Sequence, residues 1–277
     1  MAERRYSILH IPALSFYSKD LYRDVGLNWR GTCLGYLLLL LAICWIPWMV
    51  KAHIGLSDFV QNEVPKIVSQ IPTITIKDGL ASIDEPQPYY ITEPDSNEIF
   101  AIIDTTGTVT SLADSNVFLL ITKTEAIYKK NEVQSQTYSF ADIKDFTLTQ
   151  AKINKWLEVF RTVAIPVMYP FVLVFSYVYR IIQVLIYAAI GLLFAQGFRT
   201  KIEYPAMLRL AVVAVTPAII INTIVSLSGY VFCGMWLLYF AIAMVYLAFG
   251  VKAVSESQQP MDEQTFGEPP EQFGDRM

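Results

Sequence analysis

Two blocks of almost uninterrupted apolar residues constrain this chain more than any other feature. The first block runs from Gly31 to Val50 and the second from Phe171 to Val251, and a long polar segment lies between them. The first block alone provides the roughly 20 apolar residues that a helix needs to cross the hydrocarbon core of a bilayer. Hydrophobic residues make up 54% of the chain and the mean hydropathy is +0.40, which is too apolar for an ordinary soluble protein. We therefore expect an integral membrane protein that carries a soluble insert.

The order of apolar and polar segments predicts the fold class and five consecutive parts. The fold class is an α-helical polytopic membrane protein with four crossings and an inserted extracytoplasmic α+β domain. The parts are a cytoplasmic amphipathic lead-in (residues 1–30), a first transmembrane helix (31–50), the extracytoplasmic α+β domain (52–155), a membrane domain with three further transmembrane helices (156–251) and a disordered acidic cytoplasmic tail (252–277).

Charges beside the apolar blocks predict the orientation of the chain. Basic residues precede the first block and few charges follow it, so the positive-inside rule places the N-terminus in the cytoplasm. Three further crossings return the C-terminus to the cytoplasm, together with the cations Arg199, Lys201, Arg209 and Lys252. A fifth crossing, made by splitting residues 162–198, remains the alternative, although it would place the first three of these cations outside. We therefore expect a multi-pass protein of the bacterial inner membrane.

Three prolines and an amphipathic pattern predict how the helices begin and end. Aromatic and aliphatic residues alternate with charges in the lead-in, which predicts a short helix lying on the inner membrane face. Pro47 is expected to end or kink the first crossing, and Pro166 and Pro170 are expected to kink the segment that returns the chain to the membrane. A separate helix is expected from Leu56 to Ser69, with Ser57 as its N-cap.

The polar insert has the alternating pattern of β-strands. Ile74 and Ile76 alternate with polar residues, and the Lys77-Asp78-Gly79 turn leads into a second alternating run, which predicts a β-hairpin. Further strands are expected at residues 89–92, 98–104, 117–122, 126–129, 136–140 and 143–148. With the leading helix, these strands predict a small α+β sheet domain.

The composition of the insert excludes several classes of function. Residues 52–155 contain fourteen acidic residues against eight lysines and no arginine, which argues against binding of nucleic acid. The three cysteines, Cys33, Cys44 and Cys233, all lie in apolar segments, so neither a disulfide framework nor a zinc site is expected. Motifs for nucleotides, for a catalytic serine or for a metalloprotease are absent from the sequence. We expect no cofactor, no metal and no catalytic residue.

The most enzyme-like residue is Asp104, at the end of the hydrophobic run Ala101 to Ile103. An Asp-Thr-Gly sequence after such a run is typical of aspartic proteases, in which two carboxylates share one proton. Here an extra threonine separates Asp104-Thr105 from Gly107, and the chain has no second copy of the motif. We therefore interpret Asp104 as a carboxylate at the end of a central strand, bonded to turn amides.

A second candidate site lies within the apolar blocks. Arg180 and Gln183, with tyrosines nearby, form the most polar patch there, and Asn222 lies in a later crossing. A charge inside a membrane is costly, so Arg180 is expected to face protein or water. These three residues either line a path for a substrate or ion, or they form contacts between helices, with Arg180 bonded to backbone carbonyls, to Asn222 or to Thr216.

Several stretches resemble one bacterial membrane protein family, catalogued as domain of unknown function 1189. The stretches are FYSKDLYRDV, IPTITIKDGLASIDEPQPYYI, FAIIDTTG, YRIIQVLIYAAIGLLF and RLAVVAVTPAIIINTI, and the resemblance covers roughly residues 5–250. Its most specific residues form a candidate motif of the outer domain: Asp78, Gly79, Pro88, Tyr89, Asp104 and Thr105. The membrane half is also distantly similar to the Yip1-type membrane fold. The resemblance implies no catalytic residues, because the family has no assigned activity.

Two functions from different classes are compatible with the sequence. The first is a non-enzymatic envelope protein whose outer domain senses or binds a protein partner or ligand, or serves as a scaffold. The second is a transport or channel component with a polar path near Arg180, Gln183 and Asn222. We prefer the first, because no Asp or Glu lies within the core of an expected crossing and no inverted repeat is visible. The lipid bilayer is the one partner that both functions require.

Overall fold

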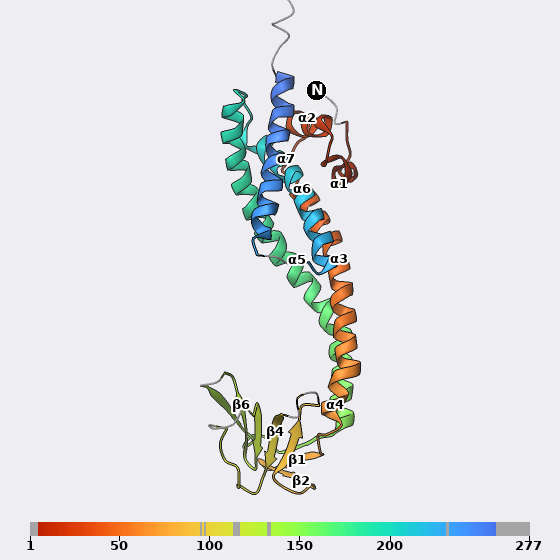
Figure 1. Ribbon diagram of the computed structural model, residues 1–277, viewed down its shortest axis with the longest axis vertical. Coiled ribbons are helices and arrows are strands. Elements are labelled where there is room, and N and C mark those ends of the chain that lie inside the picture. Colours follow the sequence, from red (N-terminus) through yellow and green to blue (C-terminus); the bar gives the residue numbers. More distant parts are fainter. Residues whose placement is uncertain are drawn as a thin grey trace, which may run out of the picture. The chain divides into compact units, whose positions relative to one another are not determined.

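A computed structural model describes residues 5–94, 96, 98–112, 117–131, 134–230 and 233–258 of the chain (Figure 1). Most of the predicted acidic tail, residues 259–277, lies outside these described residues. The chain divides into two compact units. The sheet unit is Ala52–Val167, and the helical unit combines Met1–Lys51 with Met168–Met277.

The described part of the sheet unit contains two β-sheets. The smaller sheet has the order β2-β1-β8 and is antiparallel; its strands are β1 (Ile74–Lys77), β2 (Leu80–Ile83) and β8 (Asp145–Leu148). The larger sheet has the order β3-β4-β5-β6-β7, and its strands are β3 (Tyr89–Thr92), β4 (Ile99–Asp104), β5 (Leu119–Thr122), β6 (Glu125–Lys129) and β7 (Ser135–Ser139). Only the central pair β4 and β5 is parallel. The strands expected from the alternating pattern are therefore confirmed, with ends that shift by one or two residues.

The predicted hairpin between β1 and β2 is also confirmed. Asp78 and Gly79 form its two-residue loop, and both have positive φ angles, 48° and 78°. Two positive φ angles characterise the type I′ turn, in which an Asp-Gly pair is favoured. The backbone N–H groups of Asp78 and Gly79 donate to the carbonyls of Lys144 and Ile143, 2.8 and 2.9 Å away, so the loop is anchored to the segment before β8.

The helix boundaries differ from those expected at the prolines. Helix α3 (Leu34–Asp58) passes through Pro47 and Ser57 and continues through a π-helical turn, η2 (Phe59–Glu63), into α4 (Val64–Val68). The prediction of a separate helix capped by Ser57 is therefore wrong. A proline or a capping residue in the sequence therefore does not always end a helix. In a long apolar helix, neighbouring groups can satisfy the backbone carbonyl that loses its hydrogen bond at a proline.

Helix α5 (Gln150–Gly197) likewise passes through Pro166 and Pro170 without a break. The alternative with five crossings needed a split between residues 162 and 198, and α5 has none. Four helices among the described residues are long and apolar enough to cross a membrane: Leu34–Val68, Gln150–Gly197, Tyr204–Ser228 and Met235–Gln258.

The helical unit is built around helix α6 (Tyr204–Ser228). Every residue of α6 from Met207 to Ile219 is buried, while α7 (Met235–Gln258) and the N-terminal segment pack against it. The lead-in folds into α1 (Ile11–Leu14) and α2 (Lys19–Leu27), after a short 3-10 turn η1 (Ile8–His10). Three apolar side chains of α2, Leu21, Tyr22 and Val25, are completely buried in this core. The expected helix is therefore formed, and one of its faces packs against protein.

Two polar residues fasten α2 in place. The Asp24 carboxylate accepts hydrogen bonds from Asn28, from the Trp29 indole and from the backbone of Arg5 and Tyr6. Burial favours the neutral acid, but these four donors outweigh it and lower the pKa of Asp24 below its ordinary value.

Arg209 on α6 is the second of these residues. Its guanidinium donates to the carbonyls of Val25, Gly26 and Gly31 at 3.1, 3.3 and 3.2 Å. Carbonyls at the C-terminal end of a helix lack helical partners, so Arg209 satisfies the end of α2. Besides the topological role expected from its charge, Arg209 therefore has a packing role in the helical unit.

Candidate functional site

An apolar cleft lies between the two sheets of the sheet unit. Its volume is about 440 Å³, within the range of roughly 300–1,000 Å³ that is typical of ligand sites. One charged residue, Asp145, belongs to its lining. The lining residues are Ile74, Ile76, Leu119, Ile121, Ala126, Phe140, Ile143, Asp145, Phe146 and Leu148. The cleft can therefore hold an apolar ligand.

The alternating pattern of the strands produces this lining. Ile74 and Ile76 are two residues apart on β1, and Leu119 and Ile121 are two residues apart on β5, so each pair points to one face of its sheet. The two β1 side chains are buried, whereas the two β5 side chains are only half-buried. The facing sheets thus meet incompletely, and the space between them remains open.

One wall of the cleft is supported by the first turns of α5. The Phe146 ring stacks on the Trp156 ring, with 6.4 Å between ring centroids, and the Lys152 ammonium lies 5.6 Å from the centroid of Phe146. Lys152 also donates to the Thr147 carbonyl at 2.7 Å. A cation therefore lies beside a lining that is apolar except for Asp145, an arrangement that suits an amphiphilic ligand.

The candidate motif residue Asp104 has a structural role in the sheet unit. It is fully buried at the end of β4, and its carboxylate accepts hydrogen bonds from the backbone of Thr106 and Val109 and from the Thr106 hydroxyl. Burial favours the neutral acid, but these donors outweigh it and hold the pKa of Asp104 below its ordinary value. The expected bonding to turn amides is confirmed. A carboxylate whose lone pairs are occupied in this way is poorly suited to activate water.

The other motif residues also join segments of the sheet unit. Thr105 donates from its backbone and its hydroxyl to the Gln87 side chain, at 2.6 and 2.9 Å. Gln87 precedes Pro88 through a cis peptide bond, and the Tyr89 hydroxyl donates to the carbonyl of Gln70 at 2.8 Å. Together with Asp78 and Gly79 in the hairpin loop, these residues surround the sheets without lining the cleft.

Glutamine side chains that sequence reasoning overlooked carry much of this bonding. Gln70 bonds to the backbone of Thr92 through both ends of its amide, and Gln150 donates to the carbonyls of Ser69 and Ile71. A glutamine far from its partners in sequence gives no periodic signal. These contacts could therefore be found only from the fold.

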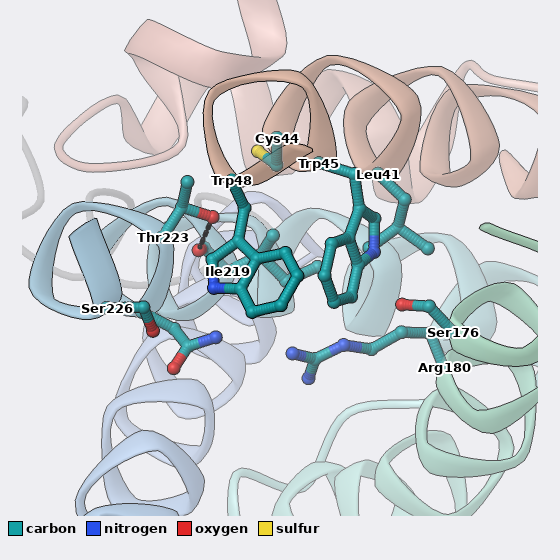
Figure 2. A pocket seen from close by; sticks show the side chains of 10 residues that line it. Leu41, Cys44, Trp45, Trp48, Ser176, Arg180, Ile219, Thr223 and Ser226 are labelled. Atoms are coloured by element: carbon teal, nitrogen blue, oxygen red, sulfur yellow. Dashed lines mark hydrogen bonds between the residues drawn. The ribbon is translucent and has the colours of Figure 1, made fainter. Parts of the chain in front are cut away.

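A small polar pocket lies in the helical unit, between α3, α5 and α6 (Figure 2). Its volume is about 110 Å³. Figure 2 shows the Arg180 guanidinium and the indole rings of Trp45 and Trp48 around one space, with Ser176 beside Arg180. The lining residues are Leu41, Cys44, Trp45, Trp48, Ser176, Arg180, Ile219, Asn222, Thr223 and Ser226.

Two of the three predicted polar residues line this pocket, and the third supports it. Arg180 and Asn222 are both lining residues, although they lie on different helices. Gln183 accepts a hydrogen bond from Arg180 at 2.5 Å and donates to the Tyr187 hydroxyl at 2.7 Å. Gln183 does not line the pocket itself, but these two bonds help to orient the Arg180 guanidinium. The expected contact of Arg180 with Thr216 is not formed, because the Thr216 hydroxyl bonds to Tyr36 and to the carbonyl of Val212.

Trp45 and Trp48 are lining residues that the sequence analysis did not single out. Their spacing of three residues puts both on one side of α3. Among the described residues, no group of three or more His, Cys, Asp or Glu side chains is arranged to hold a metal ion.

Comparisons with known proteins identify a family without an assigned activity. The model of the family described as "Protein of unknown function (DUF1189)" matches residues 13–251. The chain is also 27% identical, over 145 residues, to the "Uncharacterized protein RP489" of Rickettsia prowazekii (strain Madrid E), which covers 48% of this chain and 49% of that protein. The chain thus matches about half the length of this curated relative, and no solved structure matches it. Because the family model spans most of the chain, the protein belongs to the DUF1189 family.

Proposed function

We propose that this protein is a non-enzymatic, multi-pass protein of the bacterial inner membrane whose sheet unit lies outside the membrane and binds the acyl chain of a lipid or fatty acid. The observation that carries the proposal is the apolar cleft between the two sheets. Such a ligand could signal the state of the envelope, which fits the sensing or binding role expected from the sequence.

The chemistry of the cleft favours an unbranched acyl chain over a polar ligand. Aliphatic and phenyl side chains form nearly all of the lining, and burial of apolar surface is worth about 0.8 kcal/mol for each methylene group. A polar ligand would lose its bonds to water there without replacing them. The Lys152 ammonium beside Phe146 offers a partner for an acidic head group.

The covalent connections of the sheet unit support the same ligand. The chain enters and leaves this unit through α3 and α5, both of which are long and apolar enough to cross a membrane. A domain attached to a bilayer at both ends meets acyl chains at high local concentration. The similarity of the membrane half to the Yip1-type fold and the cytoplasmic position of both termini remain parts of this proposal.

Photocrosslinking of a fatty acid tests the proposal. The full-length protein in lipid nanodiscs is exposed to a fatty acid that carries a diazirine in its chain, and the labelled peptides are mapped by mass spectrometry. We expect labels on the lining segments 119–126 and 140–148, and we expect unlabelled palmitate to remove them. Labels confined to the apolar helices would contradict the proposal.

A pair of variants makes this test specific. Ala126→Phe fills the cleft and should reduce labelling of the sheet unit at least fivefold, whereas Thr137→Phe adds the same ring to the exposed strand β7 and should leave labelling unchanged. Unchanged labelling of Ala126→Phe would show that the label lies elsewhere.

Transport is the second candidate function, because Arg180 and Asn222 meet in one pocket. The two candidates differ in which part of the chain is essential. If binding by the sheet unit is the function, deletion of residues 71–150 abolishes complementation of a strain that lacks the gene, and Arg180→Leu leaves complementation nearly intact. The opposite pattern would favour transport.

A further inference from the structure

The polar pocket of the helical unit has the composition of an anion site. We propose that it binds a phosphate group, supplied by the head group of an anionic membrane lipid. This inference concerns a different site from the cleft of the sheet unit and a different part of the ligand. It shares with the proposed function only the placement of the helices in a membrane.

The charge in the pocket is a cation without an acidic neighbour among the lining residues. Arg180 is the only ionised side chain of the lining, and it donates a hydrogen bond to the neutral side chain of Gln183. A guanidinium has five N–H donors in a planar fork, and a single amide oxygen uses one of them. The remaining donors can bind a second group, and a phosphate matches this fork well.

The rest of the lining supplies further donors. Asn222 has an amide NH₂ group, Ser176 and Ser226 have hydroxyls, and Trp45 and Trp48 have indole N–H groups. No Asp or Glu side chain belongs to the lining. Such a set would repel a metal cation and can bond several oxygens of a tetrahedral anion at once.

The size of the pocket selects a small group. A single water needs a volume of about 10–15 Å³ on this scale, so a pocket of about 110 Å³ holds several waters or one phosphate group. It is too small for the acyl chains of a lipid, which would remain outside. The site therefore fits the phosphate of a head group and excludes the remainder of the molecule.

The position of the pocket along α6 favours a lipid as the source of the phosphate. Asn222 lies six residues before the end of α6 at Ser228, or about 9 Å at 1.5 Å per residue. Beside that end, the Lys51 ammonium donates to the Leu227 carbonyl at 3.0 Å. Tryptophans and lysines of this kind mark the head-group region of a bilayer. The pocket thus lies within reach of head groups in the leaflet where α6 ends.

Thermal stability of the purified protein tests the site. The full-length protein in a neutral detergent is delipidated, and its melting temperature is measured with phosphatidylglycerol, with phosphatidylcholine and with inorganic phosphate. We expect phosphatidylglycerol to raise the melting temperature of the wild-type protein, and we expect Arg180→Gln to weaken the apparent affinity at least tenfold. Arg161→Gln, on the same helix outside the pocket, is the matched control and should bind as the wild type does.

The three ligands separate the sources of the anion. Protection by inorganic phosphate alone at millimolar concentration would show that the pocket takes a free anion, which overturns the lipid assignment. Equal protection of wild type and Arg180→Gln by phosphatidylglycerol, or protection of neither, would overturn the site. If Arg180→Gln fails to fold, the double variant Asn222→Leu with Ser226→Ala removes two donors and keeps the charge, and it should weaken phosphatidylglycerol binding in the same direction. Unchanged binding by that variant would also overturn the site.

Discussion

Asp104 shows how a residue that resembles a catalytic group can serve the fold. Its carboxylate ends β4 and bonds the turn that follows, so the charged form stabilises the loop from Thr106 to Val109. A free carboxylate at the same place would be expelled toward water, because burial alone disfavours the charge. The bonds, and not the aspartate by itself, determine its chemistry.

Asp104→Asn tests this account. The asparagine side chain lacks the charge, and its NH₂ group is a donor that would face the N–H and O–H donors of Thr106 and Val109. We therefore expect the substitution to lower the stability of the sheet unit by about 1–3 kcal/mol. The measurement is thermal unfolding of the full-length protein, followed by circular dichroism. Asp84→Asn, on an exposed carboxylate, is the control and should change little.

The pH dependence of unfolding gives a second measurement at the same residue. The pKa of Asp104 is lower in the folded than in the unfolded state, so its stabilising effect is full above the unfolded value and is lost as the pH falls through the folded value. We expect the wild-type protein to lose stability as the pH falls below about 4, the ordinary pKa of an aspartate, and Asp104→Asn to lose less. Equal slopes for the two proteins would contradict the prediction.

Gly79 is constrained both by its backbone angle and by its neighbours. Its φ of 78° costs a residue with a Cβ about 1–2 kcal/mol, and that Cβ would lie 3.2 Å from Cα of Ala141 and 3.3 Å from the carbonyl oxygen of Phe140. We expect Gly79→Ala to destabilise the protein by more than Gly107→Ala, because Gly107 has φ 87° with nothing within 4 Å. Chemical denaturation of both variants measures the difference, and equal losses would show that the contact with Phe140 and Ala141 carries no cost.

At the scale of elements, the docking of α2 on α7 depends on glycines at close approaches. A Cβ at Gly250 would lie 2.5 Å from the ring of Tyr22, and a Cβ at Gly26 would lie 2.6 Å from the side chain of Val254. The Tyr22 hydroxyl also donates to the carbonyl of Ser15 at 2.8 Å, which holds the ring in place. The helices can approach only because these positions have no side chain.

Gly250→Val should therefore release α2 from the core. A buried ring held by a hydrogen bond cannot move aside without cost, and overpacking typically costs about 1–3 kcal/mol. Limited trypsin digestion should cut faster at Lys19 or Arg23 in this variant than in the wild type. Gly35→Val, on α3 with nothing within 4 Å of its Cβ, should be digested at the wild-type rate. An unchanged cleavage rate for Gly250→Val would mean that the docking of α2 does not depend on the close contact between Gly250 and the Tyr22 ring.

Strands and helices differed in how well they could be predicted. The strands from Ile74 to Leu148 were found because alternation and turn residues such as Asp78 and Gly79 act locally. The end of α3 was not found, because a proline such as Pro47 breaks a helix only when the surrounding chain does not compensate for the lost hydrogen bond. Helix continuity is therefore a property of the whole apolar segment.

At the scale of the whole molecule, the proposed membrane topology is the most accessible prediction. Four long apolar helices follow one another along the chain, and the sheet unit comes after the first of them. If each helix crosses the membrane, the segments between the helices lie alternately outside and inside. Alkaline phosphatase fused after Gly107 should be active, since the enzyme folds only outside the cytoplasm, and the fusion after Lys252 should be inactive. Activity of the fusion after Lys252 would contradict the four-crossing topology.

Like the helices and strands, the two candidate sites differ in how much of each could be predicted from the sequence. Arg180, Gln183 and Asn222 stood out in the sequence because polar residues are rare in apolar blocks. Their meeting with Trp45, Trp48 and the serines required the packing of three helices. The cleft of the sheet unit had no sequence signal, since its lining residues look like any core of alternating strands.

The positions of the apolar helices and the strands, and the acidity of the insert, follow from the order of the residues alone, because hydrophobic periodicity and turn chemistry are local properties. The packing of the lead-in into the core, the bonds of Arg209 to the end of α2 and the apolar cleft between the two sheets became visible only in the folded chain. These features depend on the free energy of contacts between residues far apart in the chain. No local pattern encodes the distance between such residues, so the sites appear only when the chain has folded.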